Sequence, residues 1–225
     1  MFRTILLDLD DTILDFGAAE RIAVAKAFTE IGLEPTEKLI KRYSEINISQ
    51  WEAFERGEIN RDRVLTRRFE ILFDELGVSC DAESCEKIYR GYLAVGHYFV
   101  EGAEEILAYL APKYDLYIAS NGVADTQYSR LQSANISHYF KNIFISETTG
   151  HHKPEKEYFD YCFARIEGFD PAETLIVGDS LTSDILGGIT AGIATCWFNR
   201  KRKPRRGDIT PTYEIHSLEE LKRLL

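Results

Sequence analysis

Three acidic residues lie at the end of a short apolar segment near the start of the chain. Ile5–Leu7 together with Leu9 has the nearly continuous apolar character of a buried parallel strand, and Asp8, Asp10 and Asp11 interrupt or follow it. Residues two apart in a strand point to the same face, so Asp8 and Asp10 could share one site if the strand continues that far. Paired carboxylates there are costly unless a cation, hydrogen-bond donors or protonation compensates them. Alone, the stretch fits a polar loop as well as a reactive site.

Three later groups of polar residues fall near the ends of predicted strands or at the start of the next helix. They are Ser120-Asn121-Gly122, Lys153-Pro154, and Gly178-Asp179 with Asp184. Each group alone is typical of a turn or a helix start. In open α/β sheets, however, ligands bind beyond the carboxyl ends of the strands. The occurrence of all four groups at such ends favours one shared site.

Two kinds of sequence pattern divide the chain. Residues 16–98 have apolar positions with helical periodicity and contain no convincing strand. From residue 99 onward strands and helices alternate, which is typical of a doubly wound parallel sheet of the α/β class. The first strand belongs to the same sheet. We therefore expect a Rossmann-like core formed by residues 1–15 and 99–225, with an inserted α-helical bundle cap at 16–98.

The expected elements have definite ranges. In the cap, helices are expected over 16–32, from Pro35-Thr36 onward, from Asn60 to Gly77, and from Ala82 to about Gly96. After the cap, strands are expected at 115–119, 142–145, 174–177, 193–197 and 212–215. Helices are expected over 102–111, 124–134, 181–191 and 217–225, and from Pro154-Glu155 to about Ile166.

The four polar groups, in this order, resemble the motifs of the haloacid dehalogenase (HAD) superfamily. The matching residues are Asp8-x-Asp10-x-Thr12, Ser120, Lys153 and Gly178-Asp179-x4-Asp184. The resemblance covers residues 3 to about 198 and includes members with a helical cap at the position of residues 16–98. It implies Mg²⁺-dependent attack of the first aspartate on a phosphate, through an aspartyl-phosphate.

The resemblance implies separate roles for the acidic residues. Asp8 would be the nucleophile and, with Asp179, a ligand of Mg²⁺, to which Asp10 adds its backbone carbonyl. Asp10 would protonate the leaving oxygen and then activate water. Asp184 would orient ligands or waters rather than bind the ion directly. Because dehalogenases of the superfamily lack an acid two residues after the nucleophile, Asp10 favours phosphoryl chemistry over dehalogenation.

The remaining motif residues would bind the phosphate. Lys153 would offset the charge on Asp8 and on the phosphoryl group. Ser120 and the N–H groups after it, including that of Asn121, would donate to phosphate oxygens.

The cap segments resemble one group of the superfamily, the house-cleaning pyrimidine 5'-nucleotidases. The supporting segments are Gln50–Ile59, Arg67–Glu70, Ser120–Gly122 with Gln127, Gly178–Ile185 and Pro211–Tyr213. Pyrimidine nucleoside 5'-monophosphates are therefore the leading substrate candidates. A sugar-phosphate or phosphoglycolate phosphatase is the alternative enzyme, and a non-catalytic binding module of the same fold is the alternative outside enzymes.

Two cap residues are candidate substrate contacts. Trp51, or Phe54 near it, could stack on a base, although apolar patterning favours packing inside the bundle. Arg67 could reach an anionic substrate. It diverges from its neighbour Arg68 on a helix, so at most one of them points inward, and surface positions are favoured for both.

Composition bounds the partners and the location. The net charge of −10 over 225 residues argues against binding of nucleic acid. The basic run Arg200–Arg206 is interpreted as a solvated loop. With no signal peptide, no apolar run of membrane-spanning length and no paired cysteine spacing, we expect a cytoplasmic protein with free thiols and no membrane partner. The expected partner is a small-molecule phosphate ester, bound by a monomer or homodimer.

Overall fold

The computed structural model describes residues 1–205 and 207–225, so Arg206 of the basic run lies outside the described residues. The chain folds as two compact units. The core unit consists of Met1–Phe16 and His97–Leu225, and the cap unit consists of Gly17–Gly96. None of the described helices combines the length and apolar character that crossing a membrane requires. The four cysteines are free thiols, as predicted.

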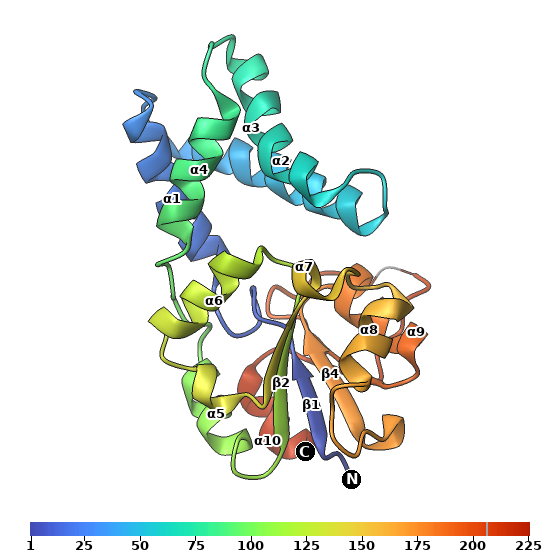
Figure 1. Ribbon diagram of the computed structural model, residues 1–225. Helices are drawn as coiled ribbons and strands as arrows, with labels where there is room; N and C mark the ends of the chain where they lie inside the picture. Colours follow the sequence, from blue (N-terminus) through green and yellow to red (C-terminus); the bar gives the residue numbers. More distant parts are fainter. Residues whose placement is uncertain (206) are drawn as a thin grey trace. The chain divides into compact units, whose positions relative to one another are not determined.

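In the described part of the chain, the core unit is built around a six-stranded parallel sheet (Figure 1). The strands are β1 (Thr4–Leu7), β2 (Asp115–Ser120), β3 (Asn142–Ile145), β4 (Thr174–Gly178), β5 (Ala194–Phe198) and β6 (Tyr213–Ile215). Their order is β3-β2-β1-β4-β5-β6. This order confirms the predicted doubly wound sheet. Because the chain adds strands first on one side of β1 and then on the other, the winding reverses at β1, where ligand sites form.

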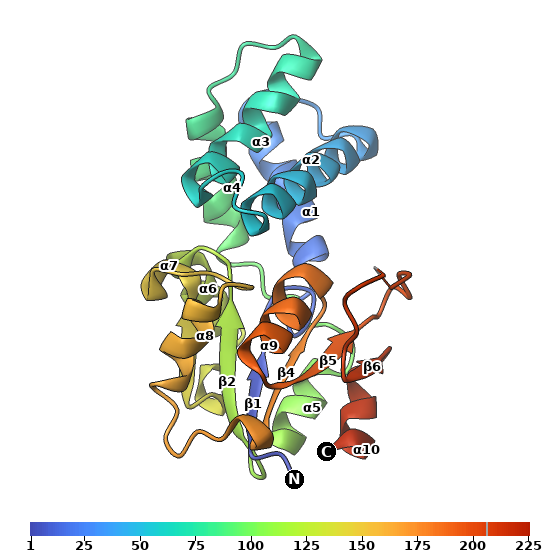
Figure 2. The ribbon, with the colours of Figure 1, turned by 90° about the vertical axis from the view of Figure 1, so that its right-hand side faces the viewer.

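Helices cover both faces of the sheet (Figure 2). They are α5 (Ala103–Leu110), α6 (Ala124–Ser133), α7 (Ser146–Thr149), α8 (Lys156–Phe163), α9 (Leu186–Ala191) and α10 (Leu221–Leu224). Ile5 and Leu7 of β1 are buried in an apolar cluster with residues of α5 and α10. Leu6 between them is buried on the opposite face with residues of α8. Burial on both faces explains the continuous apolar run in the sequence.

The predicted elements of the core unit differ from the observed ones at three places that matter for the site. Strand β1 ends at Leu7, so Leu9 and the acids beside it lie outside the strand. The helix expected over 181–191 begins with a π-helical turn, Leu181–Ile185, before α9. The short helix α7 was not predicted.

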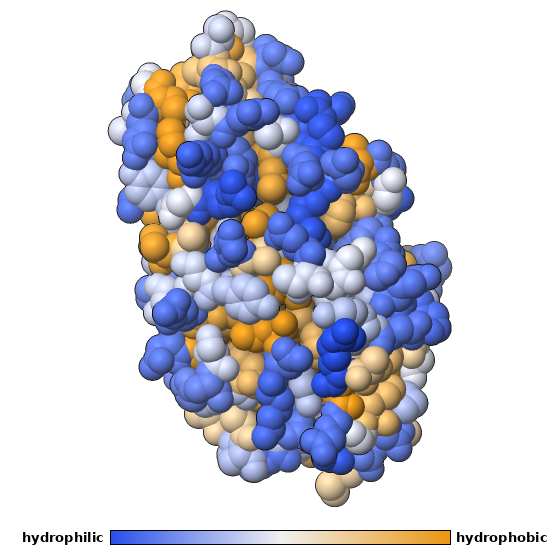
Figure 3. Space-filling view, viewed as in Figure 1, coloured by the Kyte–Doolittle hydropathy of each residue, from blue (hydrophilic) through white to orange (hydrophobic). Residues whose placement is uncertain are grey.

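The cap unit contains the four predicted helices. They are α1 (Phe16–Glu30), α2 (Glu37–Glu55), α3 (Arg61–Leu76) and α4 (Ala82–Leu93). Thr36 and Asn60 accept hydrogen bonds from the first turns of α2 and α3, and α3 ends at Gly77 with φ of 65°. Hydrophilic side chains are interspersed with apolar ones on the face in Figure 3, as is typical of a surface in water.

A buried polar network crosses the interior of the cap unit. We call Glu20, Asn47, Arg68 and Glu86 the cap network, with one residue from each helix. Arg68 Nη1 donates to Asn47 Oδ1 at 2.7 Å, and Asn47 Nδ2 donates to Glu20 Oε1 at 2.6 Å. The guanidinium of Arg68 also lies 4.8 Å from the centre of the Tyr89 ring. The predicted surface position of Arg68 is therefore wrong, because aromatic faces and polar partners compensate its burial.

Candidate active site

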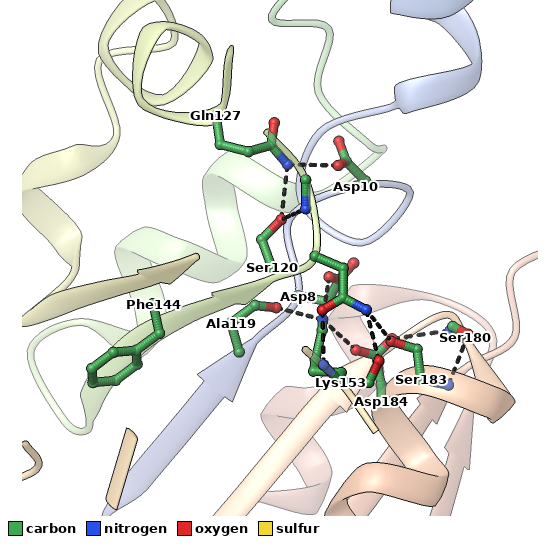
Figure 4. A network of polar contacts seen from close by, with 12 residues as sticks. Asp8, Asp10, Ala119, Ser120, Gln127, Phe144, Lys153, Ser180, Ser183 and Asp184 are labelled. Carbon is green, nitrogen blue, oxygen red and sulfur yellow. Dashed lines mark hydrogen bonds and ion pairs between the residues drawn. The ribbon is translucent and has the colours of Figure 1, made fainter. Parts of the chain in front are cut away.

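The carboxyl ends of three neighbouring strands bring the predicted polar residues to one edge of the sheet (Figure 4). Asp8 follows β1, Ser120 ends β2, and Asp179 follows β4. Lys153 comes from the loop between α7 and α8 and reaches the same edge. The site is therefore assembled by the reversal of winding at β1.

Lys153 is a buried cation between two carboxylates, with 1% of its side chain exposed. Its Nζ donates to Asp8 Oδ1 at 2.7 Å, to Asp184 Oδ1 at 2.6 Å and to the backbone carbonyl of Ala119. Burial alone would lower the pKa of Lys153, but Asp184 and Asp8 outweigh burial and raise it. The side chain therefore stays charged and ties the two acids together.

Asp8 lies in a region with more negative than positive charge. Burial raises the pKa of the Asp8 carboxyl well above its usual range, and Lys153 opposes this shift without cancelling it. Three further carboxylates raise it more: Asp184, Asp10 and Asp179. A bound cation would relieve this repulsion.

Carboxylate oxygens of Asp8, Asp179 and Asp184 lie within 4.8 Å of one another. Oxygen donors at such distances suit Mg²⁺, so these residues fit the ion that the sequence predicts. Both oxygens of Asp184 already accept hydrogen bonds, from Lys153 and from the backbone N–H of Ser180 at 3.1 Å. Asp8 and Asp179 are therefore the better candidates for ligands, and the geometry of Asp184 suits an orienting role.

The backbone after β4 explains how Asp184 reaches the site. Ser180 caps the π-helical turn by accepting from the Ser183 N–H at 3.2 Å, and the turn brings Asp184 back over the strand end. A Cβ atom on Gly178 would lie 2.2 Å from Cγ of Asp184. Only glycine leaves this space, which accounts for Gly178 in the motif.

Asn121 contacts the loop that carries Lys153. Its side-chain Nδ2 donates to the Lys153 carbonyl at 2.8 Å, and its Oδ1 accepts from the Lys153 N–H at 2.9 Å. The side chain thus holds Lys153 in place. This leaves the backbone N–H of Asn121 as the group for the predicted phosphate contact.

Asp10 does not share its partners with Asp8. Because β1 ends at Leu7, the condition for a common strand face is not met, and Asp10 turns toward α6. Its Oδ2 accepts from Gln127 Nε2 at 2.6 Å, and its Oδ1 is paired with Arg130 Nη1. Neither partner had a role predicted from the sequence. Their spacing of three residues on a predicted helix directly after Ser120-Asn121-Gly122 was the available indication.

The basic loop, residues 200–205, contacts acids at the same edge of the sheet. Lys201 and Lys203 keep 56% and 55% of their side chains exposed, so the loop is solvated in part. Its ion pairs nevertheless include Arg200–Asp15 at 3.0 Å, Lys201–Asp11 at 3.5 Å and Lys203–Asp179 at 3.9 Å. A purely solvated loop is therefore too simple a description. Asp11 also accepts from the Phe16 N–H at 3.1 Å, at the start of α1.

The two cap candidates have different environments within the cap unit. Trp51 on α2 is half-buried, and its ring meets that of Phe54 edge to face at 5.7 Å. Phe54 is buried, as the packing alternative requires. Arg67 on α3 is exposed. Contacts of Trp51 and Arg67 with a substrate stay predictions.

Comparison with known proteins agrees with this architecture. A family model described as haloacid dehalogenase-like hydrolase matches residues 5–198. The chain is 47% identical to YfnB of Bacillus subtilis, which is named as a HAD-hydrolase, across 100% of this chain and 95% of YfnB. A crystal structure of YfnB bound to magnesium has a TM-score of 0.96, covering 99% of this chain and 98% of that chain.

Two further relatives have names that state an activity. The pyrimidine 5'-nucleotidase PynA of Streptococcus pneumoniae is 35% identical, across 98% of this chain and 93% of PynA. The pyrimidine 5'-nucleotidase YjjG of Escherichia coli is 30% identical, across 98% of this chain and 96% of YjjG. With a family match over most of its length and relatives that align nearly end to end, the chain belongs to the haloacid dehalogenase-like hydrolase family.

Proposed function

We propose that this protein is a Mg²⁺-dependent phosphatase that hydrolyses phosphate monoesters through an aspartyl-phosphate on Asp8. The observation that carries the proposal is the buried Lys153 between Asp8 and Asp184, beside Asp179, at the carboxyl ends of the strands. A phosphate monoester is an anion, so a carboxylate can attack it only where positive charge compensates both partners. Magnesium in the crystal structure of YfnB supports the same ion here.

The proposed steps give each of these side chains one role. A carboxylate oxygen of Asp8 attacks phosphorus, the bond from phosphorus to the leaving oxygen breaks, and Asp10, in its protonated form, gives that oxygen a proton. Asp10 then takes a proton from a water molecule, whose oxygen attacks the phosphorus of the aspartyl-phosphate. The bond from phosphorus to Asp8 breaks, inorganic phosphate leaves, and Asp8 is a carboxylate again while Asp10 is again protonated. When bound, Mg²⁺ would be held by Asp8, Asp179 and the Asp10 carbonyl, and would neutralise charge on the phosphoryl oxygens.

The phosphate-binding groups come from β2 and from the loop of Lys153. The Ser120 hydroxyl and the N–H of Asn121 would donate to phosphoryl oxygens, and Lys153 would balance the charge that Asp8 brings to the reaction.

The proposed substrates are pyrimidine nucleoside 5'-monophosphates. The support is the alignment with PynA and YjjG over nearly the whole chain, including the cap unit. A cytoplasmic location and a monomeric or homodimeric state stay predictions from the sequence.

The test is a phosphate-release screen with and without Mg²⁺. It would compare uridine, thymidine and cytidine monophosphates with purine nucleotides, sugar phosphates and phosphoglycolate. We expect Mg²⁺-dependent turnover that is fastest with the pyrimidine nucleotides and absent in Asp8→Asn. Turnover of a sugar phosphate, with uridine and thymidine monophosphates inert, would overturn the proposed substrate class. No phosphate release from any compound would favour the binding-module alternative and overturn the proposed function.

A further inference from the structure

We propose that Gln127 and Arg130 of α6 are positioning residues that hold the Asp10 carboxylate for proton transfer and fix its place relative to Ser120. The proposal rests on the proposed function, since it assigns these two residues to the acid–base step of that reaction.

The first observation is that both oxygens of Asp10 are bound by donors from α6. Gln127 Nε2 donates to Oδ2 at 2.6 Å, and Arg130 Nη1 is paired with Oδ1. The same Nη1 also donates to Gln127 Oε1 at 3.0 Å. The three side chains form a closed set of hydrogen bonds, so neither oxygen of Asp10 can turn without breaking a contact.

The second observation is the burial of the two α6 side chains. Arg130 has no exposed surface and Gln127 is 2% exposed, whereas the Asp10 side chain is 29% exposed. A fully buried guanidinium is costly, and apolar residues of similar volume often stabilise a fold equally well. Here the buried charge holds a carboxylate that is itself open to solvent. This arrangement is what a fixed acid–base group requires.

The third observation is that one amide joins the acid–base residue to the phosphate-binding hydroxyl. Gln127 Nε2 donates to Ser120 Oγ at 2.9 Å as well as to Asp10. Ser120 Oγ also accepts from the Gly122 N–H at 3.2 Å. With both acceptor positions of the hydroxyl used, its hydrogen is directed outward as a donor for a phosphoryl oxygen.

The loop after β2 is shaped to admit this amide. A Cβ atom on Gly122 would lie 2.5 Å from Gln127 Nε2. A larger residue at position 122 would displace the amide that contacts both Asp10 and Ser120. Gly122 therefore belongs to the same arrangement.

The acidity of the leaving group determines how strongly a substrate should depend on Gln127 and Arg130. A nucleoside leaves as an alkoxide, which needs the proton from Asp10 as its bond to phosphorus breaks. p-Nitrophenol is acidic enough to leave without that proton. If Gln127 and Arg130 act through Asp10, their loss slows attack on nucleotides much more than attack on p-nitrophenyl phosphate.

The experiment measures kcat/KM for uridine monophosphate and p-nitrophenyl phosphate, with Mg²⁺, in Arg130→Met and Gln127→Leu. For uridine monophosphate we expect a loss of roughly a hundredfold, and for p-nitrophenyl phosphate a loss below about tenfold. Arg130→Lys should recover part of the loss. In an Asp10→Asn background, Gln127→Leu should cost little more, because the residue it positions is already absent.

The controls separate positioning from folding. Gln132→Leu makes the same change at an exposed position of α6 and should leave kcat/KM unchanged for both substrates. Thermal unfolding identifies variants that do not fold. If Arg130→Met is among them, Gln127→Leu decides the matter, because it removes the amide without burying an unpaired charge.

Two outcomes overturn the inference while the proposed function stands. One is a folded Gln127→Leu variant that loses activity equally on both substrates. The other is a Gln127→Leu variant that keeps full activity, with the ratio of kcat/KM for uridine monophosphate to that for p-nitrophenyl phosphate unchanged. If the wild-type protein releases no phosphate, or if Asp8→Asn stays active, the proposed function itself fails and the inference fails with it.

Discussion

Each unit of the protein buries a cation among polar groups, and the two sites differ in charge balance. In the core unit, Lys153 lies between Asp8 and Asp184. In the cap unit, Arg68 lies near Glu86 and packs against three aromatic rings. Both cations are almost completely buried, with 1% and 3% of their side chains exposed.

Together with Arg90, the cap network has equal numbers of positive and negative side chains, whereas the candidate active site has more negative than positive ones. Within the cap unit, the carboxylates of Glu20 and Glu86 are accompanied by Arg68 and Arg90. Among the residues described at the candidate active site, the carboxylates of Asp8, Asp10, Asp179 and Asp184 are accompanied by two buried cations, Lys153 and Arg130, and by the exposed Lys203, which lies 3.9 Å from Asp179. Buried side chains whose charges cancel indicate a structural role. An excess of charge of one sign indicates a site for a ligand of the opposite charge.

The largest expected effect is that of Lys153→Met. Removing the cation leaves Asp8 and Asp184 uncompensated, so we expect activity to fall by more than about a thousandfold. The same variant should lose about 3–5 kcal/mol of unfolding free energy without Mg²⁺, and Mg²⁺ should restore part of this. Phosphate release and urea unfolding measure the two effects. Lys156→Met, at an exposed lysine of α8, is the control. Turnover within tenfold of wild type would contradict the role of Lys153.

Arg68→Met tests the other side of the comparison. We expect a loss of about 3 kcal/mol in unfolding free energy, because Glu86 and Asn47 lose a buried partner. Added Mg²⁺ should not reduce this loss, in contrast to Lys153→Met. Arg67→Met, one position away and exposed, should change stability by less than about 0.5 kcal/mol. Urea unfolding of both variants, with and without Mg²⁺, gives the answer. Equal losses of unfolding free energy in Arg68→Met and Arg67→Met would contradict a stabilising role for the buried Arg68.

The pH dependence of Mg²⁺ binding tests the excess of negative charge. Burial, with Asp11 and Asp184 nearby, raises the pKa of Asp179 from 3.8 to about 7. The folded protein therefore holds this proton more tightly than the unfolded chain. Without metal, the protonated Asp179 carboxyl contributes fully to folding stability below its pKa in the unfolded chain. This contribution is lost as the pH rises through about 7.

Mg²⁺ competes with that proton. The rise in Tm that Mg²⁺ causes should be small near pH ~5.5 and larger near pH ~8, because the ion needs the carboxylate. Thermal unfolding with and without Mg²⁺ measures it. Asp179→Asn should remove most of the rise at both pH values. A Mg²⁺ effect of the same size at both pH values would contradict the assignment.

The smallest effect is expected for Lys203→Ala. Lys203 is half-exposed and lies 3.9 Å from Asp179, and such pairs contribute less than about 1 kcal/mol. Removing this cation should tighten Mg²⁺ binding by no more than about fivefold. A Mg²⁺ titration of activity measures the change. Arg205→Ala, whose partner is Glu214, should have no effect. Weaker Mg²⁺ binding in Lys203→Ala would indicate that the basic loop has another role.

The sheet and the position of the site were predictable because they depend on local patterns. Apolar strands alternating with helices specify parallel strands, and parallel strands bring their carboxyl ends to one edge. Asp8, Ser120 and Asp179 each follow or end such a strand, so their meeting needed no knowledge of packing. Gly178 and Asp184 belong to the same category, since a short spacing in sequence sets their contact.

Other contacts depend on partners that are distant in sequence. Arg130 and Gln127 lie 120 and 117 residues from Asp10, and helical spacing indicated their common face but not what it would meet. Arg67 and Arg68 are adjacent and chemically identical. The aromatic rings and polar partners around Arg68, most of them on other cap helices, distinguish the buried arginine from the exposed one. The ion pairs of the basic loop likewise connect segments far apart in the chain.

The most direct test of the proposed mechanism is to trap the intermediate. Wild-type protein is mixed with Mg²⁺ and uridine monophosphate, or with the best substrate of the screen, quenched in acid after milliseconds, and digested for mass spectrometry. We expect one phosphoryl group on the peptide that contains Asp8, formed before free phosphate accumulates and absent in Asp8→Asn. Release of phosphate with no protein-bound phosphoryl group at any quench time, or a phosphoryl group on another residue, would contradict the account.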